Sequence, residues 1–141
     1  FIINDYVDIC QATDADGIHI GQDDIPVSAA RKVLGEDKII GVSTHSLKQA
    51  IRAEREGADY ISIGPIFETP LKSEMEPVGL DLIRKVKKKI EIPFVAIGGI
   101  NESNIYNVKR AGAKKVAVIR AVTSSKNIKG TALRLRRALI K

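Results

Sequence analysis

The chain has 141 residues, 44% hydrophobic and 28% charged, with a formal net charge of +6, a composition that excludes a disordered chain and suits one globular domain. No apolar run approaches the roughly 20 residues of a membrane-spanning helix, so we expect no membrane partner. The single cysteine, Cys10, cannot form an internal disulfide, which favours a reducing compartment and a cytoplasmic location.

Strands and helices are predicted to alternate along the whole chain. Short apolar runs predict strands at residues 1–5, 18–20, 38–42, 60–64, 94–97 and 116–119, and the run at 94–97 has the pattern of a strand covered on both faces. Helical patterns fall between and after them, at residues 7–13, 26–34, 47–56, 80–90, 102–110 and 126–141. Strict alternation predicts a parallel sheet with right-handed crossovers.

Basic residues cluster in residues 84–89 and 126–141, which are both predicted helices. Their apolar positions recur at helical spacing: Leu82, Val86, Ile90, Leu133, Leu135 and Leu139. The lysines and arginines are therefore expected on solvated outer faces. No aromatic residue is interleaved with them as a stacking platform would need, so nucleic-acid binding is not expected.

The strand at residues 94–97 stops at a pair of glycines. Gly98 and Gly99 lack a Cβ, so a ligand can approach their N–H groups closely. Asn101 is the expected N-cap of the following helix, whose positive dipole end would then face the same ligand. This arrangement attracts phosphate, although a glycine pair after a strand is often only a tight turn.

Polar or glycine positions follow nearly every predicted strand: Asn4, Asp5, Gln22, Asp24, Ser43, His45, Thr69, Gly98, Gly99 and Arg120. A doubly wound sheet concentrates its site at one switch point, whereas a barrel gathers all strand ends around one mouth. We therefore expect a (β/α)8 TIM barrel, of which the chain is a single domain with about six βα units. Phosphate binding after the last two strands would make these strands three to eight, with the first two units missing.

An ordered set of motifs resembles the thiamine-phosphate synthase family over essentially the whole chain. The motifs are Ile3-Asn4-Asp5, Gly21-Gln22-Asp23-Asp24, Gly41-Val42-Ser43-Thr44-His45, Gly64-Pro65-Ile66-Phe67, Thr69-Pro70-Leu71-Lys72, Pro77-Val78-Gly79-Leu80 and Ala96-Ile97-Gly98-Gly99-Ile100. The resemblance implies a barrel enzyme that joins 4-amino-2-methyl-5-hydroxymethylpyrimidine pyrophosphate to a thiazole phosphate. The products would be thiamine phosphate and pyrophosphate.

The resemblance also implies roles for individual residues. Asp5 and Asp24 would hold Mg²⁺ against the pyrophosphate, and two neighbouring carboxylates suit that cation. Asn4, Ser43 and Lys72 would contact the pyrimidine substrate, with Ser43 and Lys72 acting in catalysis and Lys72 neutralising the leaving group. The thiazole phosphate would lie against Thr69, Gly98, Gly99, Ile119 and Arg120.

Each role has a simpler alternative. Asp5 could be a helix N-cap, Asp24 a turn residue before a proline, Ser43 a helix cap and Lys72 a solvated lysine. Asp23 is expected to be solvated. If pyrophosphate leaves before the thiazole nitrogen attacks, no protein base is needed, so His19 and His45 are expected to be structural.

The chain departs from the family pattern at two positions, Leu71 and Arg120. Leu71 stands where threonine is usual and lacks its hydroxyl. Arg120 stands where a small residue is usual and could bind phosphate with a forked, charged donor, or fill the pocket.

The family's strand-two motif, Gln-Tyr-Arg, and a lysine for the pyrophosphate are also absent. Two sheet edges would then be open, for a missing N-terminal segment or another copy to cover. Two other functions therefore stay open: a thiazole tautomerase-like relative, and a non-catalytic remnant that binds phosphorylated ligands.

Overall fold

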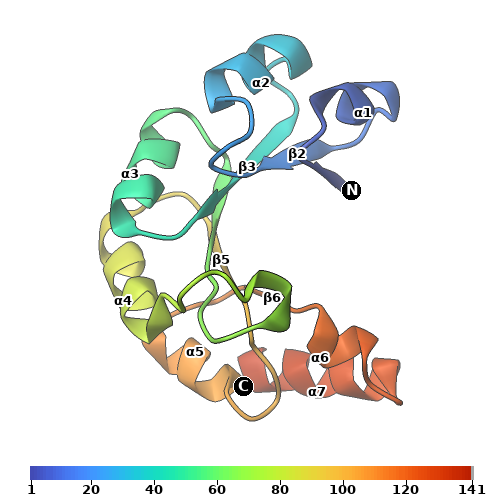
Figure 1. Cartoon of the computed structure of the whole chain (residues 1–141), viewed down its shortest axis with the longest axis vertical. Helices are drawn as coiled ribbons and strands as arrows, with labels where there is room; N and C mark the ends of the chain where they lie inside the picture. The colour runs from blue at the N-terminus through green and yellow to red at the C-terminus, as the bar shows by residue number, and fades with distance from the viewer. Residues whose placement is uncertain (141) are drawn as a thin grey trace.

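Six strands alternate with helices in the computed structural model, which describes residues 1–140 (Figure 1). The strands are β1 (Ile2–Asn4), β2 (Gly17–Ile20), β3 (Ile39–Thr44), β4 (Tyr60–Ile63), β5 (Phe94–Ile97) and β6 (Val116–Ala117). The helices are α1 (Val7–Ala12), α2 (Val27–Leu34), α3 (Leu47–Arg55), α4 (Gly79–Lys89), α5 (Ile105–Ala111), α6 (Arg120–Thr123) and α7 (Ile128–Ile140), with a short 3₁₀ helix, η1 (Pro70–Lys72). None of these helices is long and apolar enough to cross a membrane.

The six strands pair in parallel and in chain order, from β1 at one edge to β6 at the other. A doubly wound sheet would reverse its strand order at the switch point, so that architecture is excluded. In Figure 1 the sheet curls, and helices α2 to α5 follow its outer side as an arc. The chain therefore forms a curled half-barrel with one open side.

The strands bury one face against the helices and turn the other toward a cavity. Ile18, Ile40 and Ile61 are fully buried among side chains of the outer helices such as Ile83 and Val86. The alternate positions are only partly buried and line the cavity inside the curl, for example His19, Ser43 and Ser62. Residues 94–97 were expected to be covered on both faces, which is wrong for the inner face, because Val95 and Ile97 line the cavity.

Two predicted helices differ from the structure. Helix α5 begins at Ile105 and not at residue 102, because Asn101 closes a local turn in which its Oδ1 accepts the Ser103 N–H at 2.9 Å. The predicted helix over residues 126–141 begins at Ile128, as α7. Its buried face carries Thr131, Leu135 and Ala138, whereas Leu133 is exposed.

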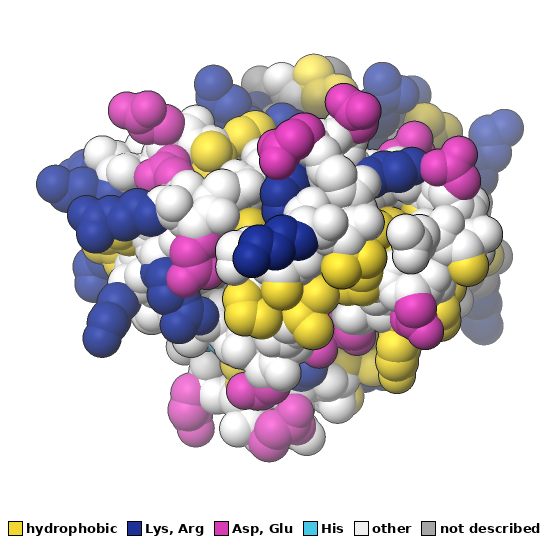
Figure 2. Space-filling view, turned by 90° about the horizontal axis from the view of Figure 1, so that it is seen from above, with side chains coloured by type: hydrophobic (Ala, Val, Ile, Leu, Met, Phe, Trp, Pro, Cys, Tyr) yellow, Lys and Arg dark blue, Asp and Glu magenta, His cyan; other side chains and the backbone are white. Residues whose placement is uncertain are grey.

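Large apolar side chains are exposed near both edge strands. Phe1 and Tyr6, beside β1, are 74% and 63% exposed, and Ile119, beyond β6, is 52% exposed. Figure 2 shows basic and acidic side chains interspersed over the face that it presents, with apolar side chains between them. The charged residues thus form no single-sign tract on that face.

The amino-terminal ends of the middle strands are joined by a polar cluster around Asp59. Its Oδ2 accepts the Ile40 N–H at 2.7 Å and a guanidinium N–H of Arg31 at 2.8 Å. The Arg31 side chain is only 17% exposed and also donates to the Gly35 carbonyl at 3.1 Å. This cluster ties α2 to β3 and to the residue before β4.

We expect Asp59→Ala to lower the free energy of unfolding by about 1–3 kcal/mol, because it leaves a partly buried guanidinium and a strand N–H without their acceptor. Chemical denaturation measures this change. The control is Asp81→Ala, which removes an exposed ion pair with Arg84 and should cost at most about 1 kcal/mol. Equal losses in the two variants would contradict a structural role for the cluster.

Candidate functional site

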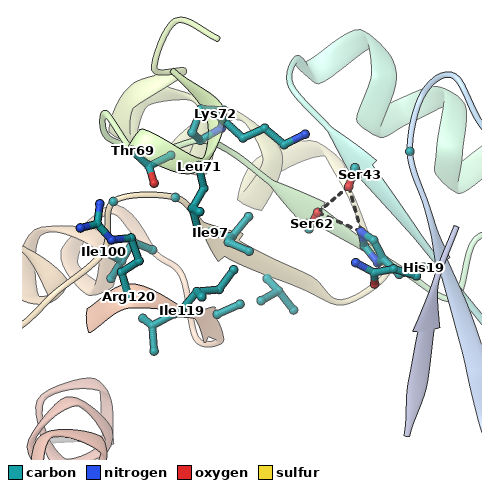
Figure 3. Close-up of a pocket in the computed structure, with 18 of the residues that line it drawn as sticks. His19, Ser43, Ser62, Thr69, Leu71, Lys72, Ile97, Ile100, Ile119 and Arg120 are labelled. Carbon is teal, nitrogen blue, oxygen red and sulfur yellow. Dashed lines mark hydrogen bonds between the residues drawn. The ribbon is translucent and has the colours of Figure 1, made fainter. Parts of the chain in front are cut away.

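A cavity of about 950 Å³ opens at the carboxyl ends of the strands. All six strands, or the segments that follow them, contribute to its wall, as parallel strands curled in one direction require. Every residue that the sequence predicted for the site lines this cavity: Asn4, Asp5, Asp24, Ser43, Thr69, Lys72, Gly98, Gly99, Ile119 and Arg120. Figure 3 shows part of this wall, with Ser43 and His19 on one side and Thr69 and Arg120 on the other.

Asp5 and Asp24 face each other at the end formed by β1 and β2. Asp5 adopts a left-handed backbone (φ 66°), and its N–H donates to the His19 carbonyl at 2.9 Å, which fixes it beside β2. Partial loss of water raises the pKa of the Asp5 carboxyl above its ordinary value, and the charge of Asp24 and a hydrogen bond to it raise it further. The charge of Lys72 acts in the opposite direction.

The structure excludes the simpler alternative for Asp5 and supports the one for Asp24. Asp5 is not an N-cap, because Tyr6 occupies that position of α1 and no side chain caps it. Asp24 does close a turn, since its Oδ2 accepts the Gly21 N–H at 2.6 Å. That bond fixes the carboxylate, and the repulsion between it and Asp5 is what a bound cation would relieve.

The donor set of this acidic pair fits Mg²⁺. Within residues 1–140 no cluster of three or more His, Cys, Asp or Glu side chains could hold a metal alone. Mg²⁺ is commonly bound by only one or two carboxylates, with water and substrate phosphate oxygens completing its octahedron. Two carboxylates that face an open cavity meet that requirement when a phosphorylated ligand is present.

Ser43 belongs to a polar network on the inner face of β2, β3 and β4. It lies within β3, and the N-cap of α3 is Ser46, so Ser43 is not a helix cap. Its Oγ is 2.9 Å from His19 Nε2, and His19 Nδ1 is 2.9 Å from the Tyr60 hydroxyl. Ser62 completes the group, with its Oγ 3.4 Å from that of Ser43.

Both histidines have hydrogen-bonded ring nitrogens, and their expected structural role stays a prediction. His45 Nδ1 is 2.6 Å from the Gly64 carbonyl oxygen. His19, in the middle of β2, also lines the cavity beside Ser43. Burial lowers the pKa of His19 below its ordinary value, against a smaller opposing effect of Asp24. The imidazole is therefore neutral near pH 7.

The long loop after β4 carries Thr69 and Lys72 over the cavity. Its first residues extend the sheet, because the Ile66 and Phe67 N–H groups donate to the Ile97 and Gly98 carbonyls at 2.9 and 3.1 Å. Beyond them, η1 presents Lys72, whose side chain in Figure 3 extends toward the Ser43 side of the cavity.

Gly98 and Gly99 lie directly beneath this loop. Both have positive φ angles, 99° and 65°, and a Cβ on Gly99 would be 2.6 Å from the Glu68 carbonyl oxygen. The Gly99 carbonyl accepts from Asn104 Nδ2 at 2.9 Å. Among residues 1–140 the N–H groups of both glycines have no hydrogen-bond acceptor, which makes them available to an anion.

Arg120 starts α6, directly after Ile119, on the wall next to this glycine turn. Figure 3 shows its guanidinium near the Thr69 side of the cavity, far from Ser43. The cavity therefore has two ends: an acidic end with Lys72 above it, and an end with free N–H groups and one arginine.

Sequence reasoning missed Tyr60 and Ser62 as residues of the wall. Gln22, one of the polar positions noted after the strands, also lines the cavity and donates to the Ser43 carbonyl at 2.6 Å. Tyr60 and Ser62 alternate with the buried Ile61 and Ile63 along β4. Strand alternation would have placed both on the inner face, had the strands been treated as half-buried.

Comparison with known proteins shows the family of this chain. The family model described as thiamine monophosphate synthase matches residues 1–122. A thiamine-phosphate synthase of Halalkalibacterium halodurans is 52% identical over 131 residues, 92% of this chain and 62% of that protein. One of Shouchella clausii is 49% identical over 140 residues, 99% of this chain and 67% of that protein.

Among solved structures, a thiamine phosphate pyrophosphorylase of Pyrococcus furiosus superposes with a TM-score of 0.90 at 37% identity, over 99% of this chain and 66% of that one. The chain thus spans roughly two thirds of the length of these relatives. The match at this identity covers the whole curled sheet and the residues of the cavity. The chain therefore belongs to the thiamine monophosphate synthase family.

Proposed function

We propose that the chain carries most of the active site of a transferase that makes thiamine phosphate. The substrates are 4-amino-2-methyl-5-hydroxymethylpyrimidine pyrophosphate and a thiazole phosphate. The main support for the proposal is one cavity with two different ends. One end is acidic and could bind a phosphate through a cation, and the other has free N–H groups and Arg120 that could bind a phosphate directly. Two phosphorylated ligands could lie in the cavity with their reacting rings between the ends.

The six βα units are proposed to be strands three to eight of an eight-stranded TIM barrel that is one domain. The curl of the sheet, the chain order of its strands and its two open edges support this assignment. The apolar side chains exposed at those edges, Phe1, Tyr6 and Ile119, would be covered by two further βα units or by another copy of the chain.

Asp5 and Asp24 are proposed to hold Mg²⁺ against the pyrophosphate of the pyrimidine substrate. When bound, the ion would neutralise negative charge on the leaving group. The raised pKa of Asp5 supports the assignment, because the facing carboxylates repel each other until a cation lies between them. The turn bond from the Gly21 N–H holds Asp24 in place for this role.

Lys72, Asn4 and Ser43 are proposed to bind the pyrimidine pyrophosphate. The bond between the pyrimidine methylene carbon and the pyrophosphate oxygen breaks, and its electron pair leaves with pyrophosphate. The thiazole nitrogen then donates its lone pair to the methylene carbon, so no proton transfer is needed at the bond that forms. Lys72, above the acidic end, would stabilise the charge on the departing group.

The thiazole phosphate is proposed to bind at the opposite end, against the following residues: Thr69, Gly98, Gly99, Ile119 and Arg120. The two glycine N–H groups without acceptors support this position. Arg120 would add a forked charged donor on the same side, where Leu71 contributes no hydroxyl. The facing carboxylates and Lys72 favour this transferase over a thiazole tautomerase-like relative, which would have no use for a metal-binding pair.

The decisive experiment is an assay of thiamine phosphate formation with both substrates and Mg²⁺. The chain is tested alone and together with a polypeptide carrying the N-terminal part of the Halalkalibacterium halodurans relative. We expect product with the added segment and at least tenfold less without it, because two further units would close the ring and complete the pyrophosphate site.

Full activity of the chain alone would contradict the assignment to strands three to eight but not the function. No product in either case would contradict the function. A tautomerase assay on the thiazole phosphate and binding of both ligands would then separate the tautomerase-like relative from the non-catalytic remnant.

We expect Asp5→Asn and Asp24→Asn each to weaken Mg²⁺-dependent pyrophosphate binding, and to lower product formation by about 100-fold, because each removes one of two carboxylates from the cation. Calorimetric titration with pyrophosphate, with and without Mg²⁺, measures the binding. The matched control is the exposed neighbour Asp23→Asn, which should leave both quantities within about twofold. Equal effects at Asp23 and Asp24 would sink the assignment of the pair.

Arg120→Ser is expected to weaken binding of the thiazole phosphate by about tenfold, because it removes a charged donor from the phosphate. The dissociation constant measured by calorimetry decides the result. Arg136→Ser, on the exposed side of α7, is the control and should change nothing. Unchanged or tighter binding in Arg120→Ser would mean that the arginine only fills the cavity.

A further inference from the structure

Gly41 has no side chain on the inner face of β3, so side chains of β2 and β4 meet across it. His19, Gly41 and Tyr60 lie in one row, because His19 pairs with Gly41 and Gly41 pairs with Tyr60 in the register of β2, β3 and β4. A Cβ on Gly41 would lie 2.1 Å from Tyr60 Cζ. The phenol ring therefore crosses β3 over the glycine and reaches the imidazole two strands away.

Tyr60 and His19 form a defined pair across Gly41. Their ring centroids are 5.4 Å apart with a tilt of 37°, and the Tyr60 hydroxyl lies 2.9 Å from His19 Nδ1. Among residues 1–140 this hydroxyl has no other hydrogen-bond partner. Each ring nitrogen of His19 thus faces a hydroxyl, Nδ1 that of Tyr60 and Nε2 that of Ser43, and in a neutral imidazole one nitrogen donates and the other accepts.

The proton positions follow from the donors available. A phenol is a better donor than an aliphatic alcohol, which favours the arrangement in which the Tyr60 O–H donates to Nδ1 and the ring proton resides on Nε2. In this arrangement Nε2–H donates to Ser43 Oγ at 2.9 Å, with Ser62 Oγ 3.3 Å from the same nitrogen, and the Ser62 hydroxyl donates to Ser43 Oγ at 3.4 Å. Both lone pairs of Ser43 Oγ are then engaged, so its own proton is free to point into the cavity.

We propose that Tyr60 is a positioning residue that fixes the Nε2–H tautomer of His19 and thereby makes the Ser43 hydroxyl a hydrogen-bond donor toward the substrate. The proposal rests on the proposed function, in which Ser43 contacts the pyrimidine pyrophosphate. Ser43 then selects an acceptor atom of that ligand, a pyrimidine ring nitrogen or a phosphate oxygen. In the opposite tautomer Nε2 would accept, and the Ser43 proton would be used within the protein.

The tautomer can be read without any substrate. Long-range ¹H–¹⁵N correlation spectra of the ring distinguish Nε2–H from Nδ1–H in the intact chain. We expect His19 to be the Nε2–H tautomer, and Tyr60→Phe, which keeps the ring over Gly41, to increase the Nδ1–H share. The exposed Tyr106→Phe is the control and should leave the His19 signals unchanged. An Nδ1–H tautomer in the unmodified chain would overturn the proposal.

The second measurement tests whether Tyr60 acts through Ser43. We expect Tyr60→Phe to weaken binding of the pyrimidine pyrophosphate with Mg²⁺ about fivefold, the size of one hydrogen bond. In a Ser43→Ala background the same change should have no further effect, since the hydroxyl that it orients is gone. A purely structural role would add its loss in both backgrounds, and that result would refute the inference. If the chain together with the added N-terminal segment binds no pyrimidine pyrophosphate, the proposed function fails, while the tautomer measurement still decides the role of Tyr60.

Discussion

Parallel pairing of six strands in chain order is the constraint on which this structure depends. Each strand runs in the same direction, so every carboxyl end meets the same rim, and residues far apart in the sequence share one cavity. Asp5 and Arg120 are separated by most of the chain, yet both line it. The outer helices bury one face of each strand, and the inner face is left for polar side chains.

Charge is distributed unevenly within this cavity. Two facing carboxylates on the β1–β2 side raise the local negative potential, while the glycine turn after β5 presents N–H groups and lies near an arginine. Lys72 is carried by the loop after β4 and extends toward the acidic side. A molecule with phosphates at both ends of the cavity would therefore meet a cation-dependent contact at one end and direct donors at the other.

Much of this organisation could be predicted from the sequence, for physical reasons. The alternation of apolar runs and helical patterns predicted all six strands, and the polar residues after them predicted the lining of the cavity. The prediction that a helix starts at residue 102 was wrong, because Asn101 Oδ1 accepts the Ser103 N–H within a local turn. Composition does not decide between this bond and the one that would cap a helix.

The network of Tyr60, His19 and Ser43 was missed for a different reason. It depends on the register of three strands, which places Gly41 between a tyrosine and a histidine. No local pattern contains that information. His19 was expected to be structural from its place within a strand, but its hydrogen-bond partners lie 24 and 41 positions later in the chain.

The glycine turn beneath the β4 loop has a consequence for how two ligands would influence each other. The base of the loop is bonded to the end of β5, and its tip carries Lys72 on the other side of the cavity. An anion bound to the Gly99 N–H would restrain the segment that determines where the ammonium group lies. The affinities of the two substrates would then be thermodynamically linked, each increasing the other by the same factor.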